Sequence, residues 1–250
     1  MSGNGGGPGA SVASRLLGLL GAFDPDHRTL TLSELARRAG LPLATAHRLV
    51  AELMAWGALT RTPAGDYVVG RRLWDLGLLA PVQSGLRQIA SPFLHDIYAA
   101  TLATVHLAVR DGIEVLYVDR LAGHASVPVV STIGSRLPMH TTGVGKVLLA
   151  HAPDEVRREA FQHLSRVTPY SIVQPGQLRA ELDRVRRDGF AQTHEEMSLG
   201  ACSVAVPILA PDGSVVASLG IVVASLKRDR PRLLAALQVA AQGVARNIPA

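Results

Sequence analysis

Two short helical patterns and a candidate β-hairpin follow one another over residues 32–69 with almost no residues between them, which constrains the fold more than any other feature. The first pattern spaces its apolar residues as one buried helix face requires, at Leu32, Leu35, Ala36 and Ala39. Thr31 or Ser33 can cap its start. Gly40 then suits a left-handed helix end, and Leu41-Pro42 begins a second helix with proline near its first turn.

The second helix repeats this periodicity, and its predicted buried residues are Ala46, Leu49, Val50 and Leu53. The residues left facing outward are Thr45, His47, Arg48 and Glu52. A tight helix pair with short polar and arginine side chains near the N-terminus of its second helix suits the major groove of DNA. There threonine can meet a thymine methyl group, and arginine can meet a guanine or a phosphate. The candidate DNA contacts on this helix are Ala44, Thr45, His47 and Arg48.

The residues that follow predict the wing of a winged helix-turn-helix. Trp56-Gly57 closes the second helix, and residues 59–61 and 67–69 can then pair as a hairpin. Arg61 lies where a wing would contact phosphate, and it completes the set of candidate DNA contacts. The alternative is a helical corner and hairpin that serve packing alone, with Arg48 as a solvated surface arginine.

The composition bounds the class of protein. The 250 residues, 48% of them hydrophobic, suffice for one large domain or two ordinary domains with packed cores. A net charge of +5 fits a nucleic-acid partner, but the excess of Arg over acidic residues in residues 1–80 is small, so charge alone does not reveal DNA binding. The sequence has one cysteine, no export signal and no apolar stretch of membrane-spanning length. We therefore expect a cytoplasmic protein without a membrane partner.

Outside the helix-turn-helix, the patterns predict a second, α+β domain. Further helices are expected at residues 14–23, 71–79, 86–102, 143–151, 154–164, 177–188 and 230–247. Strands are expected at residues 104–110, 113–120, 126–132, 203–209 and 215–224. Asp111-Gly112 between the first two strands is a dipeptide favoured in hairpin turns. This order predicts a largely antiparallel sheet covered by helices rather than a doubly wound fold.

A loop rich in glycine and hydroxyl residues, residues 134–146, leads from a strand into a helix. Helix N-termini expose unpaired N–H groups, and glycine lets a ligand approach them, so this loop can seat a carboxylate or an oxyanion. It is not a P-loop, because His140 stands five positions before Gly145 and Val147 follows Lys146. The alternative is an ordinary helix that Thr142 caps and in which Lys146 is exposed.

The chain resembles the IclR family of transcriptional regulators from about residue 12 to 247. Three features carry the resemblance in order: the winged helix-turn-helix, Gly134-x-Arg136-x-Pro138-Met139-His140-x-x-x-x-Gly145-Lys146, and Glu195-Glu196-x-x-x-Gly200-x-x-Ser203-Val204-Ala205-Val206-Pro207. The resemblance implies an N-terminal DNA-binding domain, a linker helix and a C-terminal GAF-like effector-binding domain. It also implies homodimers or homotetramers that bind double-stranded operator DNA.

The resemblance further implies which residues bind a small-molecule effector. Carried over by position, they are Val129, Leu137, Met139, His140, Gly143, Val144, Ala201, Ser203, Gly220 and Val222. Several family members have cysteine in place of Ser203 and serines near Gly220 and Val222, so this pocket is less polar. It disfavours a very small hydrated acid such as glyoxylate, and it suits an apolar or aromatic acid or a related neutral molecule.

Other residue types that carry chemistry point to no second site. His140, His194, Glu195, Glu196 and Cys202 could ligate a metal, as in some family members, but none form a helical His-x-x-x-His or a Cys-x-x-Cys pair. We therefore expect no metal and no cofactor. We expect Glu195 and Glu196 to form an acidic pair on the surface. No recognisable nucleophile motif surrounds Cys202, so we do not expect it to act with His140 as the nucleophile of a hydrolase. The two adjacent glutamates would point to opposite faces of an extended strand, unlike a glycosidase pair.

These inferences combine into one expectation and one alternative. We expect a ligand-responsive DNA-binding regulator, a repressor of a palindromic operator. Its expected parts are a disordered tail (residues 1–11), the winged helix-turn-helix (12–72), the linker helix (73–84) and the effector-binding domain (85–250). The alternative is an enzyme or small-molecule carrier that uses residues 134–146 as its site.

Overall fold

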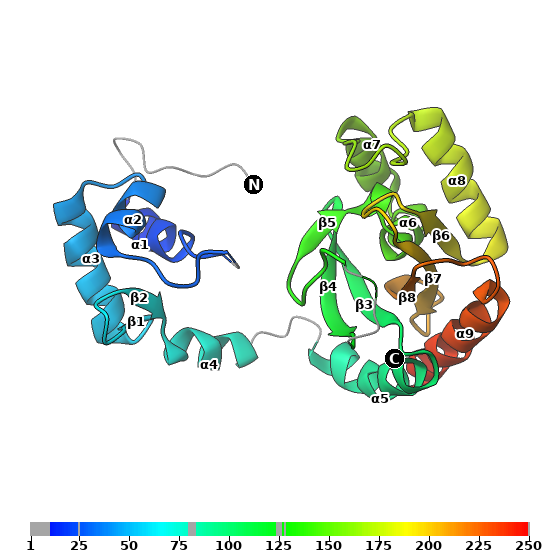
Figure 1. Cartoon of the computed structure of the whole chain (residues 1–250), viewed down its shortest axis with the longest axis horizontal. Coiled ribbons are helices and arrows are strands. Elements are labelled where there is room, and N and C mark those ends of the chain that lie inside the picture. Colours follow the sequence, from blue (N-terminus) through cyan, green and yellow to red (C-terminus); the bar gives the residue numbers. More distant parts are fainter. Residues whose placement is uncertain (1–10, 25, 80–83, 124–126, 128, 250) are drawn as a thin grey trace. The chain divides into compact units, whose positions relative to one another are not determined.

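The computed structural model describes residues 11–24, 26–79, 84–123, 127 and 129–249. They belong to two compact units, Met1–Val82 and Gln83–Ala250 (Figure 1). Residues 1–10 of the predicted tail and residues 80–83 of the predicted linker helix lie outside the described residues.

The first unit begins with three helices, α1 (Val12–Leu20), α2 (Leu32–Arg38) and α3 (Leu43–Trp56). Thr31 and Glu34 form a reciprocal cap at the start of α2, in which each side chain accepts a hydrogen bond from the backbone N–H of the other residue. The pKa of Glu34 is lowered by the bond that its carboxylate accepts from the Thr31 N–H and by a second one from the Thr31 hydroxyl at 2.8 Å. Gly40, at φ +64°, turns the chain between α2 and α3, and Gly57, at φ +85°, ends α3. The predicted helix-turn-helix is confirmed.

The predicted wing follows as two antiparallel strands, β1 (Leu59–Arg61) and β2 (Tyr67–Val69). Leu30 and Tyr67 exchange two backbone hydrogen bonds of 3.0 and 2.8 Å, which attach the wing to the segment before α2. The next helix, α4 (Arg71–Leu79), begins against the end of α3. There the Arg72 guanidinium lies 4.5 Å from the centre of the Trp56 ring and donates to the Trp56 carbonyl at 3.2 Å.

The second unit is built on a six-stranded sheet in the order β5-β4-β3-β8-β7-β6. Its strands are β3 (Thr104–Asp111), β4 (Glu114–Leu121), β5 (Arg136–Pro138), β6 (Ala191–His194), β7 (Cys202–Leu209) and β8 (Val215–Val223). Every pair of neighbouring strands is antiparallel, which confirms the predicted α+β class.

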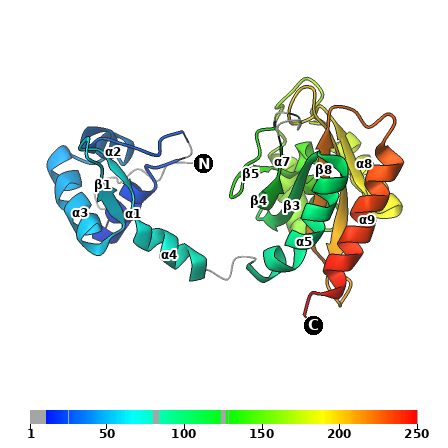
Figure 2. The same cartoon turned by 60° about the horizontal axis from the view of Figure 1, so that its bottom comes forward.

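Helices cover both faces of this sheet. The helices α5 (Ser84–Thr101) and α9 (Arg230–Arg246) lie side by side on one face (Figure 2). The other face carries α6 (Gly143–Ala150), against which α7 (Asp154–Gln162) and α8 (Pro175–Asp188) pack. A short 3₁₀ turn, η1 (Met139–Thr141), leads into α6. Because side chains alternate along a strand, each of the inner strands contributes to two different cores.

Two details of the predicted sheet are wrong. Within the predicted third strand, residues 127 and 129–132 are not in a strand, and residues 126 and 128 lie outside the described residues. The edge of β4 is instead occupied by β5 and by Gly134, whose N–H donates to the Tyr117 carbonyl at 2.8 Å. The sequence patterns also missed β6, a four-residue edge strand paired only with β7.

Within the described residues, no helix has both the length and the apolar character that crossing a membrane requires.

Candidate functional site

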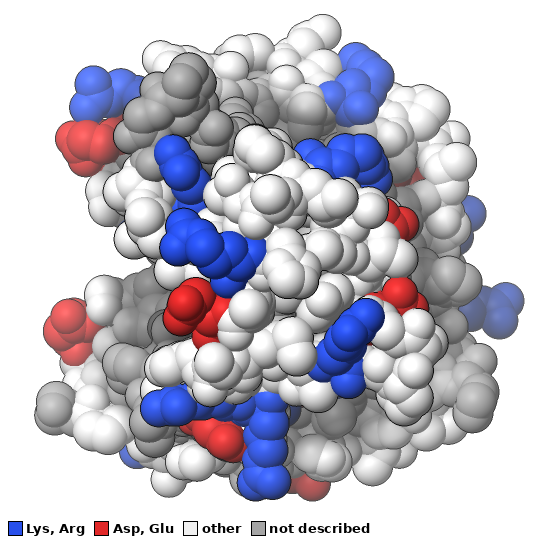
Figure 3. Space-filling model, turned by 90° about the vertical axis from the view of Figure 1, so that its left-hand side faces the viewer, with Lys and Arg blue, Asp and Glu red and all other residues white. Residues whose placement is uncertain are grey.

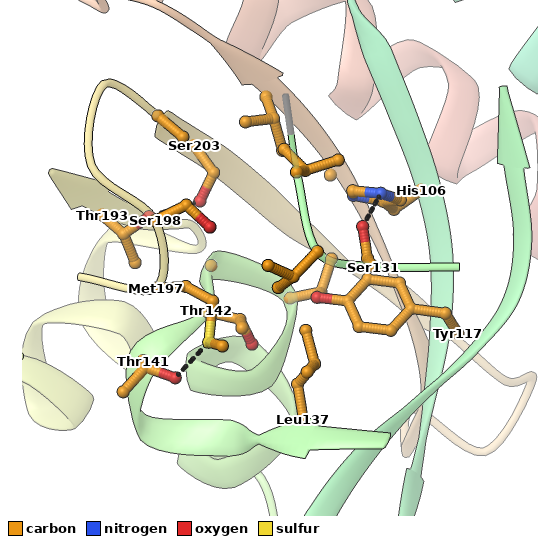
Figure 4. Close-up of a pocket in the computed structure, with 17 residues that line it drawn as sticks. His106, Tyr117, Ser131, Leu137, Thr141, Thr142, Thr193, Met197, Ser198 and Ser203 are labelled. Carbon is orange, nitrogen blue, oxygen red and sulfur yellow. Dashed lines mark hydrogen bonds between the residues drawn. The ribbon is translucent and has the colours of Figure 1, made fainter. Parts of the chain in front are cut away.

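A cavity lies between the sheet and the N-terminus of α6 in the second unit (Figure 4). Glycines on the facing elements leave the room for it. A Cβ atom at Gly220 on β8 would meet Val144 Cγ1 at 2.7 Å. A Cβ atom at Gly143, the first residue of α6, would meet Ser203 Oγ at 2.5 Å. Any larger residue at either position would therefore crowd the cavity.

The structure brings most of the sequence-predicted effector residues to this cavity. Eight of them line it: Val129, Leu137, Gly143, Val144, Ala201, Ser203, Gly220 and Val222. Met139 and His140 do not. Both lie in η1, where Met139 packs into the core around α6 and His140 Nε2 lies 2.9 Å from the Ser165 carbonyl oxygen. Burial lowers the pKa of His140.

One polar end of the cavity is formed by the N-terminus of α6 and two hydroxyl groups of the sheet. Thr193 Oγ1 and Ser203 Oγ lie 2.6 Å apart, on paired residues of β6 and β7. Thr142 caps α6, as the alternative for this loop had it, because its hydroxyl accepts a hydrogen bond from Gly145 N at 3.1 Å. The N–H groups of Gly143 and Val144, in the same first turn of α6, have no partner within the helix. Together with the helix dipole they favour a negatively charged group.

The other polar end consists of His106 on β3 and Ser131, whose Oγ lies 2.8 Å from His106 Nε2. Both residues are 3% exposed. Burial, and secondarily the charge of Arg120, lowers the pKa of His106 to about 3, so the imidazole is neutral at pH 7. Tyr117 packs edge-on against this ring with 4.8 Å between ring centres. Burial raises the pKa of Tyr117, so its phenol stays protonated.

A tight loop after β6, residues 195–201, closes one side of the cavity with Met197, Ser198 and Ala201. Glu195 adopts φ +55°, and its N–H donates to the Ala201 carbonyl at 2.9 Å. Two hydroxyl groups from the segment before α8 hold this loop from outside. Thr168 Oγ1 donates to the Glu195 carbonyl at 2.7 Å, and Ser171 Oγ donates to the Glu196 carbonyl at 2.8 Å.

The alternative in which Lys146 is exposed is wrong, and so is the expectation of Glu196 as a surface residue. Lys146 is fully buried in α6, and its ammonium group lies 2.6 Å from Glu196 Oε1 and 3.7 Å from Glu181 Oε1 on α8. Glu196 is 7% exposed, and its Oε2 has no hydrogen-bond partner. Burial raises the pKa of Glu196, while the adjacent Lys146 opposes that shift. The pair links the cavity loop to the helix whose N-terminus faces the cavity.

Sequence reasoning missed nine residues that line the cavity. They are His106, Tyr117, Val130, Ser131, Thr141, Thr142, Thr193, Met197 and Ser198. The one available signal was the alternation at the start of β3, where Thr104 and His106 alternate with Val105 and Leu107. Within a strand that faces two cores, a buried polar residue marks the face that carries a polar site.

The other candidate chemistries gain no support from the geometry. The described residues contain no group of three or more His, Cys, Asp or Glu side chains that could hold a metal ion. Cys202 is buried in the core under α5 and α9, on the opposite face of the sheet from the cavity, and burial raises the pKa of its thiol. Glu195 and Glu196 are not on an extended strand, because they belong to the tight loop after β6.

In the first unit, α3 presents the side predicted to contact DNA. Ala44, His47 and Arg48 are exposed and Thr45 is half-buried, while the predicted inner residues Ala46, Leu49, Val50 and Leu53 are buried. Arg61 on the wing is exposed, although its Nε donates to the Gly65 carbonyl at 2.9 Å and its guanidinium lies 5.8 Å from the centre of the Tyr67 ring. The turn therefore orients Arg61 but leaves its side chain accessible.

In the view of Figure 3, basic side chains are separated by uncharged surface and a few acidic groups. The charge pattern in this view is discontinuous, and residues 1–80 carry only a small excess of arginine over acidic residues. A helix that presents specific side chains to the groove does not need a continuous basic surface, although phosphate contacts add affinity.

A winged helix-turn-helix joined to a second unit with an internal cavity defines a class of protein, the ligand-responsive regulators of transcription. Residues 12–63 match the family described as "IclR helix-turn-helix domain", and residues 80–248 match "Bacterial transcriptional regulator IclR C-terminal". The chain belongs to the IclR family and is a DNA-binding transcriptional regulator.

Several known proteins are similar over most of their length. The regulator XynR of Escherichia coli (strain K12) is 30% identical over 211 residues, which cover 83% of each chain. The p-hydroxybenzoate hydroxylase transcriptional activator of Acinetobacter baylyi is 31% identical over 210 residues, or 81% of this chain and 77% of that one. A crystal structure of an IclR homologue from Microbacterium hydrocarbonoxydans, complexed with 4-hydroxybenzoate, matches with a TM-score of 0.90 and 34% identity. That match covers 95% of this chain and 98% of the other. These relatives are regulators and not enzymes, which sets aside an active site at residues 134–146.

Proposed function

We propose that this regulator senses a monoanionic aromatic, or otherwise largely apolar, carboxylic acid in the cavity of its second unit. The observation that carries the proposal is the pairing of apolar walls with neutral polar ends. The described lining residues include no Asp, Glu, Lys or Arg. A small dianion would lose its hydration without meeting a counter-charge, whereas an aromatic ring would bury apolar surface.

The ligand's carboxylate has a natural place at the N-terminus of α6. Gly143 and Val144 supply free N–H groups, and Ser203 supplies a hydroxyl beside them. The body of the ligand then contacts Val129, Leu137 and Val222. Met139 and His140, which the family resemblance placed in the site, contribute by packing around η1 in this proposal.

Two relatives support an aromatic acid. One was crystallised with 4-hydroxybenzoate, and another activates transcription for p-hydroxybenzoate hydroxylase, according to their descriptions. Both are more than 30% identical to this chain over most of its length. We therefore propose 4-hydroxybenzoate and its close analogues as the first ligands to test.

For the DNA-binding unit, we propose base-edge contacts from Ala44, Thr45, His47 and Arg48 and a phosphate contact from Arg61. One recognition helix reads only a few base pairs, so we propose a homodimer or homotetramer on a palindromic operator. We further propose a cytoplasmic repressor that the ligand releases from DNA. The names of relatives include both a repressor and an activator, so the sign of regulation needs its own reporter assay.

The DNA contacts can be tested by gel shift on the DNA upstream of the protein's own gene. We expect Arg48→Ala to weaken specific binding by about 1–3 kcal/mol if Arg48 makes a bidentate base contact. Arg158→Ala, which removes an exposed arginine in the second unit, serves as the matched control and should bind as the unmodified chain does. Equal affinity of the two variants at fixed salt would remove Arg48 from the interface.

The ligand site can be tested with Gly143→Ala, because the added Cβ would lie 2.5 Å from Ser203 Oγ. We expect this variant to bind operator DNA normally and to lose the response to 4-hydroxybenzoate. A ligand changes DNA affinity only through its different affinities for two conformations, so a blocked cavity removes the response alone. A variant that binds the ligand and still responds would place the effector site elsewhere.

A further inference from the structure

The end of the cavity formed by His106 and Ser131 has no role in the carboxylate seat at α6. Figure 4 shows the pair across the cavity from Ser203, and the apolar side chain of Leu137 lines the cavity below them. Their hydrogen bond of 2.8 Å joins two buried side chains from segments 25 residues apart. Such a long-range polar contact is costly to bury unless the polar atoms are satisfied or meet a ligand.

The strand register sets the separation of the two ends. His106 on β3 pairs with Gly220 on β8, and Ser203 on β7 pairs with Val222 on the same strand. β8 thus lies between the two ends, and two strand spacings separate them by about 10 Å across the sheet. Gly220, which has no side chain, leaves the space between them open. A flat ring with substituents at opposite positions suits this gap.

The chemistry of the His106 end is neutral. The imidazole is uncharged at pH 7 because its pKa is about 3, and a serine hydroxyl both donates and accepts. Arg120, the β4 residue paired with His106, is not among the cavity-lining residues, although its charge helps to keep the imidazole neutral. A hydroxyl group can hydrogen-bond to this pair without a net charge, whereas a second carboxylate would be desolvated without a lining counter-ion.

We propose that His106 and Ser131 determine ligand specificity by recognising a neutral hydroxyl group on the effector, opposite the carboxylate that the α6 N-terminus holds. This inference rests on the proposed function, since it needs an aromatic acid in the cavity. The His106–Ser131 end would then select monoacids with a para-hydroxyl group over benzoate, which has none, and over para-dicarboxylates.

The test is calorimetry on the full-length protein with benzoate, 4-hydroxybenzoate and benzene-1,4-dicarboxylate. The unmodified chain should prefer 4-hydroxybenzoate to both other acids. Ser131→Ala should reduce its preference for 4-hydroxybenzoate over benzoate by about tenfold, the value of one buried neutral hydrogen bond. Ser131→Thr keeps a hydroxyl and should retain most of the preference. His106→Gln tests the partner in the same way, and thermal melting checks that each variant is folded.

Ser203→Ala is the control at the opposite end. It should lower the affinities for benzoate and 4-hydroxybenzoate by the same factor, so the ratio of the two affinities stays unchanged. An unchanged ratio in Ser131→Ala would overturn the assignment of the hydroxyl subsite, even if both acids bind. If that unchanged ratio comes with an equal loss of affinity for benzoate and 4-hydroxybenzoate, the carboxylate lies at the His106 end. Tight binding of the dicarboxylate would have the same consequence. If the unmodified chain binds none of the three acids, the proposed function itself fails.

Discussion

The two faces of the six-stranded sheet are built from the same strands but from different kinds of residue. On the face under α5 and α9, β7 and β8 contribute Val204, Val206, Leu219 and Ile221, all buried and apolar. On the opposite face the same strands contribute mostly smaller or polar residues, namely Ser203, Ala205, Ser218 and Gly220, beside Val222. The first face is filled by side chains, and the second leaves the cavity.

The difference shows how one sheet can separate stability from ligand binding. A close-packed apolar core stabilises the fold in proportion to the surface that it buries. The cavity face instead buries the Lys146 ion pair, the His106–Ser131 pair and a capped helix N-terminus, all of which need satisfied partners to be tolerated. We expect substitutions on the two faces to act on different properties.

The largest effect is expected for Lys146→Met on the cavity face. It leaves the Glu196 carboxylate buried beside Glu181 without a counter-ion, and breaking a buried pair in this way costs about 3–5 kcal/mol. The measurement is the free energy of unfolding of the full chain in urea at pH 7, followed by hydrogen exchange at the amides of β7 and β8. Trp56 and Trp74 both lie in the first unit, so tryptophan fluorescence serves as an internal control that should not change.

A double variant sharpens this prediction. In Lys146→Met with Glu196→Met no charge from this pair remains, so most of the lost stability should return. If the single variant costs no more than an exposed substitution, the pair does not hold the cavity face together.

Leu219→Ala on the apolar face should cost about 3 kcal/mol, within the range for a leucine fully buried in a core. The loss arises from the apolar surface removed and from the void left behind. The same hydrogen-exchange measurement reports it, and calorimetry should show unchanged affinity for 4-hydroxybenzoate. If the variant is fully folded and still binds the ligand much more weakly, the two faces are not independent.

The pH dependence of stability should come partly from His106. Its folded-state pKa of about 3 lies below the unfolded value, so the unfolded chain binds a proton first as the pH falls. The resulting stability is present above about pH 6.5 and is lost towards pH 3, by about 2 kcal/mol between pH 6 and pH 4.5. His106→Gln lacks this contribution, so the stability difference between the two proteins should change by that amount. Parallel pH profiles would contradict it.

The smallest change in stability is expected for Gly220→Ala. The added Cβ meets Val144 Cγ1 at 2.7 Å, and local overpacking costs about 1–3 kcal/mol, with the low end expected here because the Val144 side chain can adjust. The same methyl group enters the cavity, so the affinity for 4-hydroxybenzoate should fall by more than the stability loss implies. Calorimetry and urea titration of one preparation compare the two effects. If Gly220→Ala destabilises the chain as much as Leu219→Ala, the contrast between the faces is wrong.

Local patterns predicted the fold of the first unit well because its constraints are close in sequence. Thr31 and Glu34 are three residues apart, and Gly40 and Gly57 adopt positive φ where the helices turn or end. In the second unit the same approach failed for residues 127 and 129–132, the described part of the predicted third strand. A β-branched run predicts a strand, but only the free edge of β4 decides which segment pairs there, and β5 occupies it.

The candidate site divides in a similar way. The family resemblance placed Gly143, Ser203 and Gly220 on one cavity, although no local pattern relates them. It also placed His140 there, whereas the tight 3₁₀ turn brings Thr141 to the cavity and His140 to Ser165. No pattern indicated that Lys146 is buried, because a lone lysine in a helix is usually exposed and its partners are 35 and 50 residues away.

By itself, the sequence determined the helix-turn-helix, the wing, the antiparallel class of the second unit and the family. Each of these depends on short-range spacing or on motifs read in order. Only the tertiary structure decided which face of β3 His106 occupies, which segment closes the edge of β4 and where the charge of Lys146 is compensated. The reason is physical: burial and pairing are set by contacts between residues far apart in the chain, and the same local pattern is compatible with several such partners.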